Sequence, residues 1–390
     1  MEYTVDEVLK YIEEEDAKFI RLAFRDAFGV QKNLSVMPGE IRKAFGLGIP
    51  VNARSIAGFE EGPHSLLYLK PDSSTLAVLP WRPDSGRVLR MFCELVTPEG
   101  EEAPADTRTL LRKAEAEARE AGVEFRFGAE TEFYLFLKDE NGNPTKTPYD
   151  RAGYMDIAPL DRCENIRREI CLTAERMGLT PERSHHEQGP GQNEIDFHYA
   201  KPVKAADQMT TFRMVVSTMA DRYGLYADFS PMPLPGEPRN GCRINIYAAD
   251  RDGGDVSEYA AAGILRRLRD ITVFLNPPGE AGTGQETAGA AGSGEGIAQL
   301  MYVGKYQGKN RVELRAPDAS GNPYLVYALL ICAGLEGIRE RLALPRPGEE
   351  IPPLPGSSEE AELLASGSSF VRGILPEELI RKYCPGKAPH

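Results

Sequence analysis

The first hundred residues show one helical pattern followed by a series of short strand patterns. Apolar positions recur at helical spacing from Val5 to about Glu15. Apolar and polar residues then alternate from Phe19 to Asp26, before a Phe28-Gly29 turn. Further strands are expected over 33–36, 66–69, 75–79 and 88–96, with one short helix over 40–45. These patterns predict a small domain built mainly from a sheet.

The stretch 97–108 interrupts the strand patterns. It is polar and contains two prolines, and Asp106 stands where it can cap a helix over 107–121. We therefore place a domain boundary at about 98–106, which divides the chain into domains of 1–100 and 101–390.

The second domain alternates strand and helix patterns. Strands are expected over 124–137, 193–198, 225–229, 243–247 and 311–315, and helices over 161–177, 205–222, 256–275 and 323–341. This arrangement predicts an α+β fold. The Gly-rich stretch 277–296 has little to bury and is predicted to be a loop. It lacks the G-x-x-x-x-G-K-[ST] pattern, so a phosphate-binding loop is not expected there.

Composition and charge narrow the class of protein. The 390 residues are 41% hydrophobic and 27% charged, an ordinary mixture for a globular protein. The net charge of −13 repels nucleic acid and anionic lipid. No apolar run approaches the ~18 residues of a membrane helix, and the acidic start is unlike a signal peptide. We therefore expect a cytoplasmic protein without nucleic-acid or membrane partners.

Two pairs of glutamates are candidates for metal binding. Glu130 and Glu132 lie two apart in a strand whose odd positions are mainly apolar, so both carboxylates project from the other face, ~7 Å apart. Glu187 and Glu194 flank a Gly/Pro turn that joins two strand ends. Oxygen ligands favour magnesium or manganese over zinc. Taken alone, Glu130 and Glu132 are better explained by a solvated strand face, and Glu187 and Glu194 by a solvated hairpin.

The strand over 311–315 carries a second charge pattern. Arg311, Glu313 and Arg315 share one face, with Val312 and Leu314 behind. One interpretation is a series of surface salt bridges. The other is an anion site beside a metal ligand, because guanidinium groups bind carboxylates and phosphates through paired hydrogen bonds.

Three of these segments together resemble the glutamine synthetase family. FGAETEFYLF, SHHEQGPGQNEIDF and RVELRAPDASGNPYL stand in the order and approximate spacing seen in that family. LKPDSSTLAVLPWR and RMFCELVTPEGE are similar to its small β-grasp domain, and YALLICAGLEGI to its long C-terminal helix. The resemblance covers nearly the whole chain. It implies a small N-terminal β-grasp-like domain and a larger catalytic domain with a curved antiparallel sheet flanked by helices.

The resemblance also implies site residues and cofactors. Glu132, Glu187 and Glu194 match the ligands of one catalytic Mg²⁺ or Mn²⁺, and Glu130 and Glu313 match two ligands of a second. In the family these metals hold the ATP phosphates and the side chain of glutamate, whose γ-carboxyl is phosphorylated before ammonia displaces the phosphate.

Further matches concern the substrate and the assembly. Arg315 matches a residue that holds the substrate carboxylate, Arg311 one near the transferring phosphate, and Asn240-Gly241 the turn beside the glutamate backbone. Family members form homo-oligomers, commonly stacked six-membered rings with active sites between subunits. The resemblance thus implies an amino acid or related carboxylate as substrate.

Several positions depart from the family pattern. Where the family reads S-G-M-H-x-H, with a metal-binding and a phosphate-contacting histidine, this chain has Arg243, Asn245 and Tyr247. Asn245 can still offer a carbonyl oxygen to a metal. The family's D-G-S-S loop, whose aspartate helps to bind ammonium, reads Asn52-Ala53-Arg54-Ser55 here. The arginine-bearing segments that the family carries between 277 and 311 are absent.

These matches and departures leave three functions open. The first is an ATP- and metal-dependent carboxylate-amine ligase with weakened glutamine synthesis or another substrate. The second is a catalytically inactive relative that acts as a regulatory or assembly partner. The third is a metal-dependent hydrolase of a glutamate-like amide, because a bound metal can activate water without ATP. Binding of ATP distinguishes the first from the other two.

Overall fold

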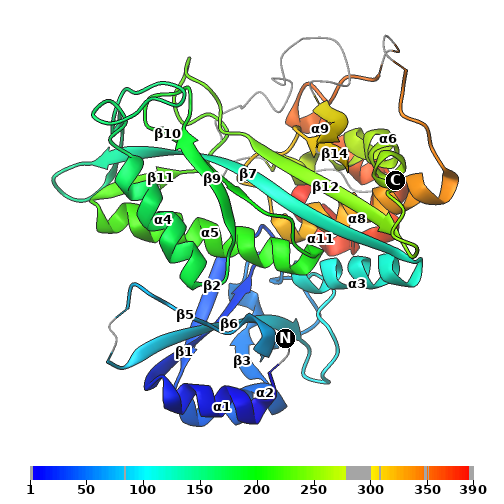
Figure 1. Ribbon diagram of the computed structural model, residues 1–390. Helices are drawn as coiled ribbons and strands as arrows, with labels where there is room; N and C mark the ends of the chain where they lie inside the picture. Colours follow the sequence, from blue (N-terminus) through cyan, green and yellow to red (C-terminus); the bar gives the residue numbers. More distant parts are fainter. Residues whose placement is uncertain are drawn as a thin grey trace.

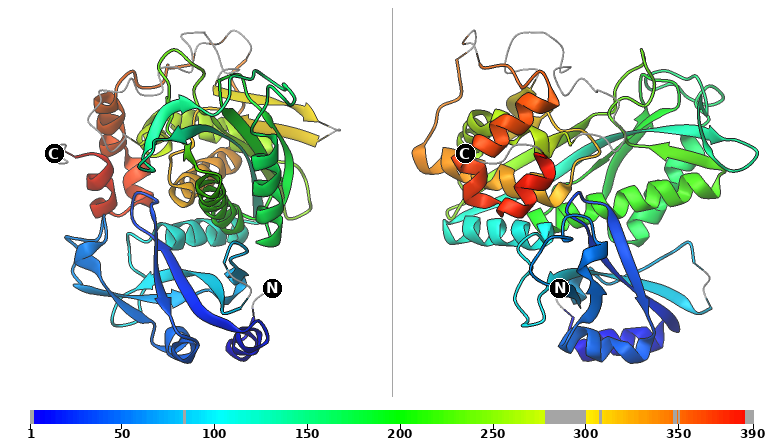
Figure 2. Two further views of the ribbon diagram at one scale, coloured as in Figure 1. Left: turned by 90° about the vertical axis from the view of Figure 1, so that its left-hand side faces the viewer. Right: turned by 180° about the vertical axis from the view of Figure 1, so that it is seen from behind.

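The computed structural model describes residues 3–82, 85–277, 300–306, 309–346, 349 and 351–385. The predicted Gly-rich loop lies outside the described residues, apart from Pro277. The chain forms a small sheet domain and a larger domain stacked upon it, with helix α3 (Thr107–Glu120) lying between the large sheet and the small domain (Figures 1 and 2). The predicted α+β fold, with a β-grasp-like domain before a curved antiparallel sheet, is confirmed.

The N-terminal sheet has the strand order β2-β1-β6-β4-β3, with β5 also beside β6. Strands β1 and β6 are parallel, and the other pairs are antiparallel. Helix α1 begins at a capping box between Thr4 and Glu7, and it buries Val8 and Ile12 in the core of this domain. The elements are α1 (Val5–Glu14), β1 (Ala17–Arg25), β2 (Gln31–Val36), η1 (Pro38–Glu40), α2 (Ile41–Gly46), β3 (Ile49–Asn52), η2 (Ala53–Ser55), β4 (Leu66–Pro71), η3 (Ser73–Thr75), β5 (Ala77–Val78) and β6 (Arg87–Val96).

The large sheet has the order β13-β14-β12-β7-β10-β9, with β8 and β11 beside β7. All its pairs are antiparallel. Helix α3 begins at Asp106, whose side chain accepts from the Arg108 amide, as predicted. The other elements are β7 (Val123–Lys138), β8 (Pro144–Pro148), α4 (Glu164–Arg176), β9 (Pro181–His186), β10 (Gln192–Phe197), α5 (Pro202–Arg222), β11 (Leu225–Asp228), β12 (Cys242–Asp250), α6 (Ser257–Leu275), β13 (Met301–Tyr306), β14 (Lys309–Leu314), α8 (Pro323–Glu340), α9 (Ser358–Gly367), α10 (Ser369–Ile374) and α11 (Glu377–Tyr383).

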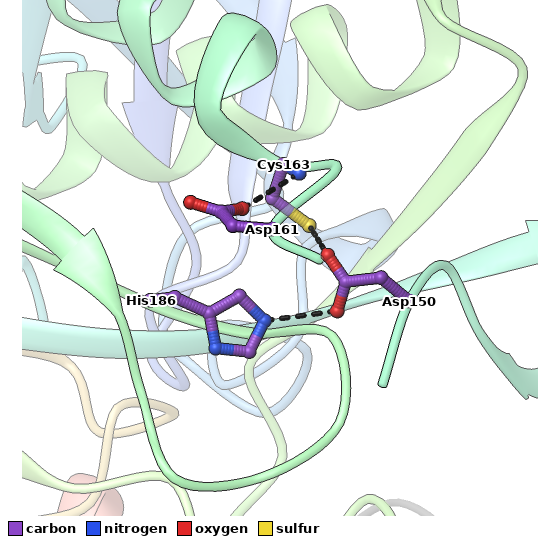
Figure 3. Close-up of side chains that lie close together, drawn as sticks. All are labelled: Asp150, Asp161, Cys163 and His186. Atoms are coloured by element: carbon purple, nitrogen blue, oxygen red, sulfur yellow. Dashed lines mark hydrogen bonds and ion pairs between the residues drawn. The ribbon is translucent and has the colours of Figure 1, made fainter. Parts of the chain in front are cut away.

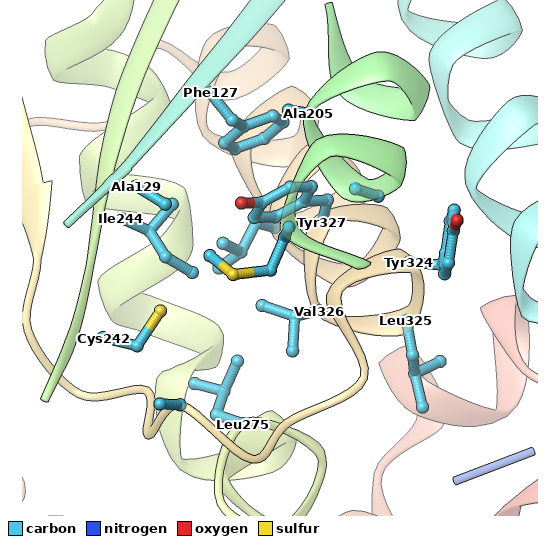
Figure 4. Packing of buried hydrophobic residues seen from close by; sticks show 14 of the residues in the cluster. Phe127, Ala129, Ala205, Cys242, Ile244, Leu275, Tyr324, Leu325, Val326 and Tyr327 are labelled. Carbon is cyan, nitrogen blue, oxygen red and sulfur yellow. The ribbon is translucent and has the colours of Figure 1, made fainter. Parts of the chain in front are cut away.

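One face of the large sheet packs on helices and forms the main core. Phe127 of β7 stacks on Tyr327 of α8, with ring centroids 4.4 Å apart, and Ile244 of β12 lies in the same cluster (Figure 4). Helices α6 and α8 approach closely because both carry glycine at the contact. A Cβ on Gly263 would lie 2.2 Å from the Ala333 carbonyl oxygen. The apolar side chains of the strands thus pack on the helix-covered face, and their charged side chains lie on the opposite face.

A buried arginine joins the two domains. Arg108 of α3 donates to Asp72 of the small domain at 2.7 Å and to Asp207 of α5 at 2.9 Å, and it lies 3.6 Å from Glu94 of β6. Three carboxylates from both domains therefore surround one guanidinium group. The helix-covered face of the large sheet is therefore the one that lies toward the small domain, and the opposite face is directed away from it.

Most predicted elements are present, with a few differences. The strand predicted over 75–79 is only Ala77–Val78, because Asp72 caps a 3-10 turn immediately before it. The helix predicted from Asp161 begins at Glu164, since the Asp161 carboxylate accepts from the Cys163 amide instead. Strands β3, β8 and β13 and the C-terminal helices α9, α10 and α11 were not expected, and of β9 only the end before Glu187 was. In the described part of the chain, no helix combines the length and the apolar character needed to span a bilayer.

Candidate functional site

Strand register brings charged residues together on the open face of the large sheet. Glu132 of β7 lies opposite Glu194 of β10, and Glu194 in turn lies opposite His185 of β9. Glu130 lies between Asp196 on one side and Arg243 on the other. We call the six acidic residues gathered here the carboxylate cluster: Glu130, Glu132, Glu187, Glu194, Asp196 and Glu313.

Burial distinguishes this cluster from a solvated strand face. Glu130 and Glu132 project away from the helix-covered core, as the alternation along β7 predicts, yet they are only 4% and 7% exposed. Glu194 is 2% exposed. Buried carboxylates are costly unless they are paired, hydrogen-bonded or bound to a metal. The partners of each carboxylate therefore indicate whether it is free to bind a cation.

The turn between β9 and β10 places Glu187 beside Glu194. Gly191 has φ +70°, and a Cβ there would lie 2.8 Å from the Leu135 carbonyl oxygen, so the tight turn requires glycine. His185 Nε2 lies 3.0 Å from Glu187 Oε1 and 4.0 Å from Glu194 Oε1. The sequence segment His185–Glu194 thus forms one side of the cluster.

Glu132, Glu187 and Glu194, which we call the inner group, are incompletely hydrogen-bonded. Glu132 Oε2 accepts from the Gly241 amide at 2.9 Å and from Gln192 Nε2 at 3.0 Å. Glu194 Oε2 is buried and accepts no hydrogen bond from the described residues. Burial and the neighbouring Asp196 raise the pKa of Glu194 to about 9, and burial also raises the pKa of Glu132.

Glu187 behaves differently from the other two members of the inner group. Burial raises its pKa, but hydrogen bonds from His185 and from the Gln188 amide outweigh burial and leave the pKa lowered. One ligand atom each from His185, Glu187 and Glu194 lie within 4.8 Å of one another. A buried oxygen that accepts no hydrogen bond, beside carboxylate oxygens and an imidazole, fits a divalent cation such as Mg²⁺ or Mn²⁺.

Glu130 and Glu313, the outer group, already have cationic partners. Arg311 Nη2 donates to Glu130 Oε1 at 2.6 Å and to Glu313 Oε2 at 2.8 Å. Arg243 Nη1 donates to Glu130 Oε2 at 3.2 Å, and Arg315 Nε to Glu313 Oε1 at 2.7 Å. Each of the four oxygens thus accepts from a guanidinium group. The donor set of the outer group does not fit a second cation.

The turn that the family match assigns to the substrate backbone also touches the cluster. The Gly241 amide donates to Glu132, and Asn240 Nδ2 donates to the carbonyl oxygens of Asp228 and Ser230, both at 3.0 Å. Asn240 therefore fixes the loop before β12, and this loop places Gly241 beside the inner group. The structure brings Asn240, Gly241, Arg311 and Arg315 to one site with the five glutamates predicted as metal ligands.

The altered positions fall in two places. Arg243, Asn245 and Tyr247 alternate along the same face of β12, and Asn245 Oδ1 accepts from Arg311 Nε at 3.1 Å. The oxygen that the sequence offers as a metal ligand is therefore engaged by an arginine. Asn52 caps the turn η2, and Arg54 donates to the Glu60 carbonyl oxygen. Among the described residues, neither Asn52 nor Arg54 hydrogen-bonds to a member of the cluster.

A second buried acidic group lies behind β9 and was not predicted from the sequence. Asp150, Asp161, Cys163 and His186, which we call the Asp150 cluster, also have ligand atoms within 4.8 Å of one another (Figure 3). His186 contacts Asp150 Oδ1 at 2.9 Å and the Glu187 carbonyl oxygen at 2.6 Å. Cys163 Sγ donates to Asp150 Oδ2.

Three residues of the site escaped the sequence reasoning. Arg183 pairs with Asp196 and lies 3.7 Å from Glu130, and His185 contacts Glu187. Asp196 follows Glu194 by two residues in a strand, so alternation alone places it on the same face. Arg183 and His185 have the same spacing, but the sequence indicates only the end of their strand, beside Glu187. The sequence signal was therefore present in the two-residue spacing.

The chain matches two family models that together cover most of its length. Residues 16–98 match "Glutamine synthetase, beta-Grasp domain", and residues 104–281 and 297–389 match "Glutamine synthetase, catalytic domain".

Curated relatives extend this similarity over nearly the whole chain. A glutamine synthetase of Clostridium saccharobutylicum is 35% identical over 422 residues, covering 99% of this chain and 94% of the relative. One of Methanosarcina mazei is 34% identical over 424 residues, covering 98% and 93%.

Solved structures share the fold. GmaS in complex with ADP superposes with a TM-score of 0.83 at 23% identity, covering 96% of this chain and 93% of that one. GmaS without ligand gives a TM-score of 0.81 over the same shares of the two chains.

Proposed function

Because the chain belongs to the glutamine synthetase family, we propose that it is an ATP- and divalent-cation-dependent ligase of the glutamate-ammonia type. Such a ligase joins a carboxylic acid to an amine as an amide and converts ATP to ADP and phosphate. The observation that carries the proposal is the inner group, where a buried Glu194 oxygen accepts no hydrogen bond from the described residues and has only Arg243 nearby, at 3.6 Å. A catalytically inactive scaffold has no need to keep three acidic side chains buried together.

The proposal gives each part of the cluster a role. Glu132, Glu187 and Glu194, with His185, hold one Mg²⁺ or Mn²⁺. A bound cation of this kind neutralises phosphate charge and orients oxygen ligands. Arg315 is 40% exposed in its side chain, so it can reach a substrate carboxylate while it pairs with Glu313. Gly241 and Asn240 form the wall beside the substrate.

Glutamate and ammonia are, in this proposal, a poor substrate pair. Asn245 and Tyr247 offer no imidazole on β12, and Arg54 gives the N-terminal loop a positive charge where the resembled family has an aspartate. An arginine that stabilises a transferring phosphate is worth ~10³–10⁵ in rate. The absence of the arginine-bearing segments before residue 311 therefore favours weakened glutamine synthesis or a different acid or amine.

The test is formation of glutamine or γ-glutamyl hydroxamate with Mg²⁺ and with Mn²⁺, followed together with ADP release. We expect ADP release that needs acid, amine and cation, and glutamine turnover far below the ~10 s⁻¹ typical of enzymes. Glu194→Gln is expected to abolish the ADP release. Glu182→Gln, which removes an exposed charge from the neighbouring strand, is the matched control and is expected to leave it unchanged.

Two results would change the proposal. Glutamine turnover near ~10 s⁻¹ would contradict the altered-substrate part. Absence of both ATP binding and ADP release would favour the catalytically inactive relative, which acts as an assembly partner.

We further propose a homo-oligomer, in which the small domain of one subunit lies near the large domain of the next. The family resemblance supports this arrangement, including stacked six-membered rings. Light scattering at micromolar concentration is expected to give a mass several times that of one chain. A monomer would contradict it.

A further inference from the structure

The outer group of the carboxylate cluster carries its own cations. Arg311 Nη2 is bound at once to Glu130 Oε1 at 2.6 Å and to Glu313 Oε2 at 2.8 Å. One nitrogen from β14 therefore bridges two carboxylates from strands that are not neighbours in the sheet. A metal ion shared by these two carboxylates would have to occupy the same position.

The remaining donors and acceptors around Arg311 are also satisfied. Asn245 Nδ2 donates to Glu130 Oε1 at 2.9 Å, and its Oδ1 accepts from Arg311 Nε at 3.1 Å. These two bonds fix the orientation of the amide, since only its nitrogen can donate and only its oxygen can accept. Asn245 thus has its oxygen turned to Arg311 and not to a metal.

Arg243 adds a second guanidinium group between the outer and inner groups. Its Nη1 donates to Glu130 Oε2 at 3.2 Å and lies 3.6 Å from Glu194 Oε2, while Nη2 lies 3.6 Å from Glu132 Oε1. Two positive charges, with Arg315 as a third, face the two carboxylates of the outer group. No net negative charge remains there to attract a divalent ion.

We propose that Arg311 and Arg243 replace a second divalent cation, so that the chain binds one such ion, at the inner group, and not two. The inference rests on the proposed function only in taking the inner group as the site of that one ion. Fixed guanidinium groups would then supply positive charge at the outer group whatever the metal concentration. The positive charge at the outer group would therefore be present even when free Mg²⁺ and Mn²⁺ are scarce.

The test counts bound Mn²⁺ per chain by electron paramagnetic resonance of the full-length protein. We expect one ion in the unaltered protein and two in Arg311→Met, which keeps an apolar stem but removes the guanidinium group from Glu130 Oε1 and Glu313 Oε2. Arg126→Ala is the matched control. Arg126 lies on β7 and pairs with the exposed Glu124, so its loss is expected to leave the count at one.

The possible counts separate this inference from the proposed function. Two ions in the unaltered protein, or one in a folded Arg311→Met, would overturn the inference. A count that rises from none in the unaltered protein to one in Arg311→Met would contradict the inner cation site of the proposed function, and would leave only the replacement of the outer cation by Arg311 supported. If Arg311→Met does not fold, as judged by circular dichroism, Arg243→Met frees the other Glu130 oxygen. Two ions are expected there, and one would overturn the inference.

Discussion

His185 and His186 are neighbours on β9, yet they serve two acidic groups of opposite character. His185 faces the carboxylate cluster, and His186 lies in the Asp150 cluster behind the strand. In the Asp150 cluster, burial raises the pKa of Asp150, but hydrogen bonds from His186, the Arg162 amide and Cys163 outweigh it and hold the pKa well below its usual range. In the carboxylate cluster, the pKa of Glu194 is raised to about 9.

The two clusters differ in whether every carboxylate oxygen has a hydrogen-bond donor. Both oxygens of Asp150 accept hydrogen bonds, and Asp161 pairs with Arg167. Every carboxylate oxygen of Asp150 and Asp161 has a donor within the chain, so the network stabilises the fold around β9 without a cation. The inner group keeps a buried oxygen without a donor. Two groups with similar ligand spacing thus have different roles, and spacing alone does not distinguish them.

The largest expected effect is on the closed network. Asp150→Ala leaves the buried His186 without its carboxylate, and breaking a buried pair by removal of one partner costs ~3–5 kcal/mol of unfolding free energy. Urea denaturation monitored by circular dichroism measures it. Asp252→Ala, at an exposed turn position, is the control and is expected to stay within ~0.5 kcal/mol of the unaltered protein. Equal costs for the two variants would contradict a structural role for the Asp150 cluster.

A somewhat smaller effect is expected on stabilisation by metal at the inner group. At 100 times its dissociation constant, a cation stabilises the folded chain by ~2.7 kcal/mol. Glu187→Ala is expected to remove this stabilisation, with an affinity loss beyond the ~10–100-fold typical of residues that only support a metal ligand. Thermal unfolding with and without Mn²⁺ provides the measurement. Unchanged Mn²⁺ stabilisation in Glu187→Ala would show that the inner group is not the cation site.

Stability of the metal-free protein should depend on pH because of Glu194. An unfolded chain ionises this carboxyl near its usual pKa of 4.5, whereas the folded chain keeps the proton until about pH 9. The folded state therefore binds more protons between these values, and stability falls as pH rises, by up to ~1.4 kcal/mol per pH unit. The raised pKa values of Glu132 and Asp196 act in the same direction.

Urea denaturation in EDTA at pH 6, 7 and 8 measures this slope. Glu194→Gln is expected to reduce it, since the amide does not titrate. A stability that rises with pH, or a slope that Glu194→Gln leaves unchanged, would be incompatible with a protonated Glu194 in the metal-free protein.

The smallest effect concerns the turn that links the two clusters, since the Gly191 amide donates to Asp150 Oδ1. Gly191→Ala and Gly142→Ala both place a side chain at positive φ, but only at Gly191 does the Cβ meet a backbone oxygen, at 2.8 Å. We expect Gly191→Ala to be the more destabilising by ~1 kcal/mol. Chemical denaturation of the two variants compares them directly, and equal losses would mean that the turn adjusts without strain.

The sequence predicted much of the carboxylate cluster but not its internal pairing. Alternation along β7 placed Glu130 and Glu132 on one face, and the family motifs identified Glu187, Glu194 and Glu313 as their neighbours. Arg243 lies opposite Glu130 only through the register of β12 on β7, which joins residues more than a hundred positions apart. Local spacing carries no information about such a register, so the pairing of the outer group could not be predicted.

The Asp150 cluster escaped prediction for a related reason. Asp150 lies in a loop after β8, Cys163 precedes α4 and His186 ends β9, so the three do not share one motif with short spacing. Only the folding of these segments around β9 brings them together. Periodicity identified the strands and helices of the core well, because burial on one face imposes a regular pattern, whereas loop positions follow no such pattern.

The central claim is that the inner group serves a nucleotide-dependent ligase, and calorimetric titration with a non-hydrolysable ATP analogue tests it most directly. The account predicts binding in the presence of Mn²⁺, with loss of that binding in EDTA and in Glu187→Ala, while Glu182→Gln binds as the unaltered protein does. Absence of binding by the folded, Mn²⁺-saturated protein would contradict the account.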